Sequence, residues 1–165
     1  MHPFLAKAMY FAVQMHDGQM RKDNKTPYWV HPIHVGNRLY KLEMPNEVVC
    51  AGYLHDVVED CGISVSLIRH EFSHNVAKLV DWLTNITHGM KIPRAERKKI
   101  DRDRISKAPR HAKIIKLVDR IDNLNDLDSM APEFGILYRK ESLQLLDILK
   151  GTHIDLEKEL EELCY

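Results

Sequence analysis

Apolar residues recur every three or four positions along most of this chain, the spacing that places them on one face of an α-helix. The segment from Pro3 to His16 is typical, with Leu5, Ala8 and Ala12 in such a stripe. No segment alternates as a half-buried strand does. We therefore expect an all-α fold of about eight helices, forming one compact domain over residues 1–165.

Two of the predicted helices combine apolar residues with polar groups that are costly to bury. Residues 46–61 contain His55 and Asp56, followed one turn later by Glu59 and Asp60. Side chains four positions apart share a helix face, so His55 should lie beside Glu59 and Asp56 beside Asp60. Burying four such groups requires partners, and a bound metal ion with a substrate would supply them.

The second such helix is predicted over residues 111–128. It is apolar around most of its circumference and should be central to the fold. Asp119 lies inside it, where a carboxylate without a partner would be costly. A loop at 130–135 should follow, and then a helix over 136–149. By contrast, the helix predicted over residues 94–106 is highly charged, with few apolar positions.

Charge and cysteine content narrow the possible functions. The 24 basic residues equal the 24 acidic ones, which argues against a general nucleic-acid binder. No apolar stretch approaches the ~18 residues of a membrane span. Cys50, Cys61 and Cys164 are odd in number and lack zinc-site spacing, so we expect reduced thiols in a cytoplasmic protein.

The His-Asp pair suggests a metal site that other segments must complete. Neighbouring residues point about 100° apart around a helix, so His55 and Asp56 need further ligands from elsewhere. His31, at the start of a predicted helix, and the buried Asp119 are the best candidates, although His34 competes with His31. A set of two histidines and two carboxylates suits Mn²⁺, Fe²⁺ or Zn²⁺.

Four motifs in order resemble the hydrolase domain of the RelA/SpoT family. They are Ala12…His16-x-Gly18-Gln19-x-Arg21-Lys22, Pro27-Tyr28-x-x-His31-Pro32, Leu54-His55-Asp56-Val57-Val58-Glu59-Asp60 and Lys116-Leu117-Val118-Asp119-Arg120-x-x-Asn123-Leu124. The resemblance extends over nearly the whole chain and is closest to single-domain small alarmone hydrolases, which are HD-type phosphohydrolases. Without a synthetase domain, the chain should only degrade the nucleotide.

The resemblance implies removal of the 3′-pyrophosphate from guanosine tetra- or pentaphosphate, (p)ppGpp, giving GDP or GTP. It implies that His31, His55, Asp56 and Asp119 hold one divalent ion, Mn²⁺ in this family. It leaves the oligomeric state open. It further implies the following catalytic and substrate-binding roles. Glu59 and Asp60 would handle the attacking water and its protons. Arg21 and Lys22 would contact the purine nucleotide, and Asn123 would contact the sugar. The phosphates would be contacted by Arg94, Arg97, Lys98 and Arg139.

Two departures from the family pattern leave the substrate open. Asp122 stands where relatives usually carry an aromatic residue or histidine, and Asp126 where they carry Thr or Asp; a carboxylate there would repel an anionic substrate unless it points away. One alternative is therefore a phosphohydrolase for another nucleotide, such as a nucleoside monophosphate or the 2′-phosphate of NADPH. The other is a non-catalytic nucleotide-binding module, against which the Glu59-Asp60 pair argues.

Overall fold

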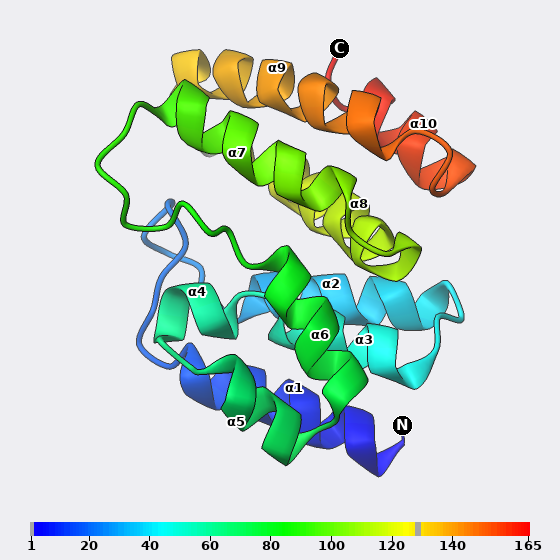
Figure 1. Ribbon diagram of the computed structural model, residues 1–165. Coiled ribbons are helices and arrows are strands. Elements are labelled where there is room, and N and C mark those ends of the chain that lie inside the picture. The colour runs from blue at the N-terminus through cyan, green and yellow to red at the C-terminus, as the bar shows by residue number, and fades with distance from the viewer. Residues whose placement is uncertain (1, 128–129) are drawn as a thin grey trace. The chain divides into compact units, whose positions relative to one another are not determined.

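The structure is a computed structural model that describes residues 2–127 and 130–165, and it confirms an all-α fold. The described residues form ten helices and no strand (Figure 1). They divide into two compact units, Met1–Thr84 and Asn85–Tyr165. In the described ranges, no helix combines the length and hydropathy that crossing a membrane requires.

Helix α3 is the centre of the first unit. Its residues from Val48 to Leu54 are all buried, because it packs against α1, α2 and α6. The six helices of this unit are α1 (Pro3–Met15), α2 (Val30–Lys41), α3 (Asn46–Leu54), α4 (Val57–Cys61), α5 (Val65–Glu71) and α6 (His74–Leu83).

The helix predicted over 46–61 is divided, which corrects the expected number of helices. Helix α3 ends at Leu54, and α4 begins only at Val57. His55 and Asp56 keep right-handed backbone angles in the turn between the two helices. The expected single continuous helix is therefore wrong, whereas the expected placement of His55 beside Glu59 stays a prediction. Gly62, with φ of 68°, ends α4 in the left-handed conformation, which a residue without Cβ adopts at little cost.

The second unit is built around α8, as its apolar pattern predicts. Helix α8 packs against α7, α9 and α10, and buries its apolar residues from Ala112 to Leu124. It ends at Asn125, before the predicted end, and residue 128 itself lies outside the described residues. The four helices are α7 (Arg94–Ser106), α8 (Arg110–Asn125), α9 (Pro132–Leu149) and α10 (Ile154–Glu162).

The loop expected over residues 130–135 is mostly helical. Helix α9 begins at Pro132, because proline lacks the N–H that the first helical turn leaves unpaired anyway.

Candidate metal centre

Two close-packed helices bring the candidate metal ligands of the first unit together. A Cβ atom added at Gly36 of α2 would overlap the ring of Tyr53 in α3, and one added at Gly52 would overlap Leu39. The two glycines therefore permit the close approach of α2 and α3. This packing places His31, in the first turn of α2, beside His55 and Asp56 in the turn after α3.

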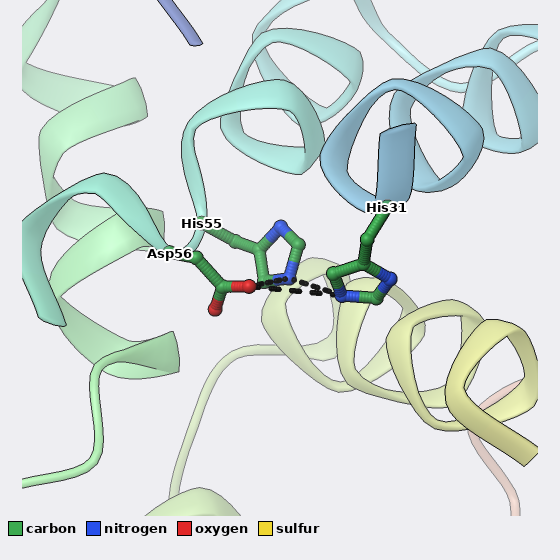
Figure 2. Close-up of side chains that lie close together, drawn as sticks. All are labelled: His31, His55 and Asp56. Carbon is green, nitrogen blue, oxygen red and sulfur yellow. Dashed lines mark hydrogen bonds and ion pairs between the residues drawn. The ribbon is translucent and has the colours of Figure 1, made fainter. Parts of the chain in front are cut away.

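The three side chains point toward one another (Figure 2). His55 Nε2 lies 3.2 Å from His31 Nε2 and 3.2 Å from Asp56 Oδ2, and His31 Nε2 lies 3.6 Å from Asp56 Oδ2. Ligands bound at about 2.0–2.2 Å with tetrahedral or octahedral angles are separated by about 2.8–3.6 Å. The three atoms therefore have the spacing that a single divalent ion requires.

The immediate surroundings fix which atoms face the site. His55 Nδ1 lies 2.8 Å from the carbonyl oxygen of Gly52, to which it donates, so that Nε2 is left with its lone pair toward the site. Asp56 takes the position before the first residue of α4, yet its side chain makes no capping hydrogen bond there. Instead, Asp56 Oδ2 accepts a hydrogen bond from Tyr28 Oη at 2.8 Å. Both groups are thereby held in orientations that suit a ligand.

His16 is buried and does not belong to the group formed by His31, His55 and Asp56. Its Nδ1 lies 2.8 Å from Gln19 Oε1, and its ring lies 4.9 Å from that of Tyr28. Burial lowers its pKa, which favours the neutral imidazole. The nearby Cys61 thiol is also held neutral, since burial raises its pKa to about 11. The pKa shifts of both groups therefore favour their uncharged forms beside the candidate ligands.

Glu59 and Asp60 lie in α4, just beyond Asp56. Glu59 is half-buried and Asp60 is exposed. Among the described residues, the group formed by His31, His55 and Asp56 does not include either of them. Their role in handling water stays a prediction.

The segment with Arg21 and Lys22 is an ordered turn rather than an irregular loop. Asp23 Oδ1 accepts hydrogen bonds from the amides of Lys25 and Thr26 at 2.8 and 2.9 Å, and these bonds lower the pKa of Asp23 to about 2. Met20 and Pro27 form an isolated bridge across the turn. Arg21 is buried and Lys22 exposed.

In the second unit, α8 brings Asp119 and Asn123 together. Asp119 is 6% exposed, and its Oδ1 accepts from Asn123 Nδ2 at 2.6 Å. Its Oδ2 lies 2.7 Å from Lys116 Nζ. These donors stabilise the ionised carboxylate that a metal ligand must supply. The assignment of Asp119 as the fourth ligand stays a prediction.

The predicted phosphate-binding residues of the second unit differ in how their charges are compensated. Arg94 is engaged in a two-fold contact with Glu141, Nε to Oε1 at 2.8 Å and Nη2 to Oε2 at 2.9 Å, which raises the pKa of Arg94. The pKa of Lys98 is lowered, first by burial and then by the positive charges of Arg120, Lys116 and Arg94. A bound anion would relieve this repulsion around Lys98.

Arg97 and Arg139 are placed differently. The buried Nε of Arg97 has no hydrogen-bond partner among the described residues. Arg139 Nε donates to the carbonyl oxygen of Leu163 at 3.3 Å. The phosphate contacts of Arg94, Arg97, Lys98 and Arg139 stay predictions, and the Glu141 pair makes Arg94 the least available of the four.

Comparison with known proteins decides the family. A model of the HD domain matches residues 8–149. This chain belongs to the HD domain family. Among relatives of this HD domain chain is a guanosine-3′,5′-bis(diphosphate) 3′-pyrophosphohydrolase, MESH1, from Danio rerio. It is 33% identical over 96% of this chain and 91% of its own length. The Homo sapiens protein of the same name is 32% identical, over 96% and 92%.

Solved structures agree. One is described as a metazoan ortholog of SpoT that hydrolyzes ppGpp and plays a role in starvation responses. It superposes on this HD domain chain with a TM-score of 0.89 at 31% identity, covering 99% of this chain and 94% of that one.

Two groups that contact the candidate ligands were not predicted from the sequence. Tyr28 belongs to the motif Pro27-Tyr28-x-x-His31-Pro32 and precedes His31 by three residues. Its position in the sequence could therefore have indicated a role near the candidate ligands. The carbonyl oxygen of Gly52 accepts a hydrogen bond from His55, but a backbone acceptor cannot be predicted from residue type. Structure was needed to recognise both contacts.

Proposed function

We propose that this chain is a divalent-metal-dependent guanosine-3′,5′-bis(diphosphate) 3′-pyrophosphohydrolase. The observation that carries the proposal is the buried group of His31, His55 and Asp56, with three ligand atoms at the spacing of one ion. The relatives whose names state this activity are similar over nearly the whole chain, which supports the same substrate here.

One divalent ion would be held by these three residues, with Asp119 as the proposed fourth ligand. When bound, such an ion polarises a phosphoryl oxygen and makes hydroxide available at neutral pH. Mixed imidazole and carboxylate ligands suit Mn²⁺, which we propose as the working ion, ahead of Fe²⁺ and Zn²⁺.

In the proposed reaction, water adds its oxygen to the phosphorus bonded to the 3′ oxygen, and the bond to that 3′ oxygen breaks. The products are GDP or GTP and pyrophosphate. Glu59 and Asp60 accept the proton that the water loses and return one to the leaving 3′ oxygen. Their position in α4, directly after the ligand-bearing turn, supports this role.

Cationic and polar side chains would orient the substrate. Arg21 and Lys22, in the ordered turn closed by Asp23, are proposed to contact the purine nucleotide, and Asn123 the sugar. The charge on Lys98, which its cationic neighbours oppose, fits a phosphate contact best within the second unit. Arg97, Arg94 and Arg139 are the further candidates.

We also propose that residues 1–165 act as one functional domain in the cytoplasm. The HD domain model spans residues 8–149 and so includes parts of both compact units. Cys50, Cys61 and Cys164 are all free thiols, which fits a reducing compartment.

The decisive experiment measures pyrophosphate release from ppGpp by metal-free protein, with and without added Mn²⁺. We expect turnover only with the ion, and a panel of pppGpp, GMP and NADPH tests the substrate. Faster phosphate release from NADPH or GMP would contradict the proposed substrate in favour of another nucleotide. Tight ppGpp binding without turnover under any divalent ion would contradict catalysis altogether.

A further inference from the structure

Tyr28 connects the two segments that carry the candidate ligands of the first unit. Its amide donates to the carbonyl of Gln19 at 2.9 Å, and its own carbonyl accepts from the amide of His31 at 3.0 Å. The backbone of Tyr28 is thus part of the turn that opens α2. Its side-chain hydroxyl reaches 28 residues along the chain to Asp56. One residue therefore ties the His31 segment to the turn that bears His55 and Asp56.

The hydrogen bond from Tyr28 engages the oxygen of Asp56 that faces the histidines. Oδ2 is the atom 2.8 Å from Tyr28 Oη, 3.2 Å from His55 Nε2 and 3.6 Å from His31 Nε2. A carboxylate oxygen has two lone-pair directions. With one accepting from Tyr28, the other is directed to the space shared with the histidines.

The ring of Tyr28 is itself held in place. It packs 4.9 Å from the buried ring of His16 at a tilt of 39°, and its centroid lies 6.0 Å from that of His31, edge to face. His16 is tied in turn to Gln19 at 2.8 Å. The Tyr28 hydroxyl is therefore oriented by contacts that its ring makes within the first unit.

We propose that Tyr28 is a positioning residue, which fixes the Asp56 carboxylate in its metal-binding orientation before the ion arrives. This inference rests on the proposed metal site and deepens it. Partners that orient ligands in this way typically account for about 10–100-fold in metal affinity. Tyr28 should act on the affinity for the ion and leave the chemistry at saturating ion nearly unchanged.

The test replaces Tyr28 by Phe, which removes the hydroxyl and keeps the ring on His16. The control is Tyr53→Phe, because Tyr53 Oη donates to Asn37 Oδ1 at the same 2.8 Å, elsewhere in the same unit. Mn²⁺ binding is measured without nucleotide, by electron paramagnetic resonance of the free ion. We expect Kd to rise about 10–100-fold in Tyr28→Phe and to stay unchanged in Tyr53→Phe.

A second readout separates positioning from general damage. Absorption bands of the Co²⁺-loaded protein report ligand geometry, so Tyr28→Phe should change them and Tyr53→Phe should not. Pyrophosphate release by Tyr28→Phe at limiting Mn²⁺ should fall, and saturating Mn²⁺ should restore it.

Four outcomes would overturn the inference. Wild-type Mn²⁺ affinity and wild-type Co²⁺ bands in Tyr28→Phe would refute it alone and leave the metal site standing. Equal losses of affinity in Tyr28→Phe and Tyr53→Phe, or a Tyr28→Phe chain that fails to fold, would show that the hydroxyl serves stability. A wild-type chain that binds no divalent ion would refute the metal site as well. Metal binding weakened as expected in a chain inactive on ppGpp would uphold the inference and refute the substrate.

Discussion

The two units of this chain differ in how their buried polar groups are arranged. In the first unit, His31, His55 and Asp56 converge on one another, and each contributes an atom suited to a cation. In the second, charges of opposite sign are already paired, as in Arg94 with Glu141 and Lys116 with Asp119. The first arrangement gathers metal-ligating atoms, whereas in the second burial and the charges of Arg120, Lys116 and Arg94 lower the pKa of Lys98.

This difference indicates how one chain could bind two ligands of opposite charge. Three potential ligand atoms 3.2–3.6 Å apart have the spacing at which one divalent ion could bind all of them. A half-buried lysine among like charges is unfavourable until an anion arrives. The first unit is thus suited to a metal ion, and the phosphate contacts of the second unit stay a prediction. Five experiments test this contrast between the two units.

The largest effect should come from Asp56→Asn. The amide keeps the shape of the carboxylate and removes the charge on the metal ligand. Loss of several kcal/mol of metal-derived stabilisation corresponds to a fall in kcat/KM of about 10³-fold or more. Glu47→Gln is the matched control, because Glu47 accepts from Ser73 and Asn75 at 2.9 Å and serves only structure. Equal activity of the two variants, measured as pyrophosphate release, would contradict the metal assignment.

Glu141→Gln should destabilise the second unit. Glu141 is 7% exposed, and the substitution removes the charge that its two hydrogen bonds with Arg94 use. We expect the free energy of unfolding in urea to fall by about 1–3 kcal/mol. Glu133→Gln, on the exposed first turn of the same helix, should change it little. If both variants unfold at the same urea concentration as wild type, the pair contributes nothing to stability.

Lys98→Gln should weaken substrate binding without lowering the free energy of unfolding. Removing a charge that Arg120, Lys116 and Arg94 repel should leave the free energy of unfolding unchanged or higher. The KM for ppGpp should rise about tenfold, equivalent to roughly 1.4 kcal/mol. Lys99→Gln, next to it and exposed, is the control. An unchanged KM in Lys98→Gln would remove Lys98 from the substrate site.

The same residue predicts a pH dependence with a definite sign. Because the pKa of Lys98 is lower in the folded chain, the unfolded chain binds more protons between that value and 10.5. Stability attributable to Lys98 should therefore rise as pH increases through this window. The rise should be absent from urea unfolding of Lys98→Gln.

The smallest effect concerns the turn that holds Arg21 and Lys22. Hydrogen bonds lower the pKa of Asp23 to about 2 from 3.8, so the stability they add is present above pH 3.8 and lost as pH falls toward 2. Amide exchange at Thr26 should accelerate over this range in wild type. Asp23→Asn should exchange faster at neutral pH and lose the acid dependence, and wild-type-like protection in the variant would contradict the role of Asp23.

Periodicity predicted the all-α fold and the central place of α8, because burial of an apolar stripe is written directly in residue spacing. The break at His55 and Asp56 was missed. Both residues keep right-handed angles, so nothing in their helix preference indicates that α3 ends there.

The site could be predicted from the sequence only in part, because it depends on contacts between residues that are distant along the chain. The candidate ligands His31, His55 and Asp56 were predicted from residue type and position, and the structure brings them together. The pairing of Arg94 with Glu141 joins residues 47 apart, and the bond from Tyr28 to Asp56 spans 28. Such pairings depend on helix packing, which spacing within a single helix does not report.

The central claim is that the first unit binds the catalytic ion through His31, His55 and Asp56. It is tested most directly by anomalous diffraction from crystals grown with Mn²⁺. We expect one strong peak about 2.0–2.2 Å from His31 Nε2, His55 Nε2 and an oxygen of Asp56. A Mn²⁺ peak bound elsewhere, with these three residues carrying no ion in protein that hydrolyses ppGpp, would contradict the account.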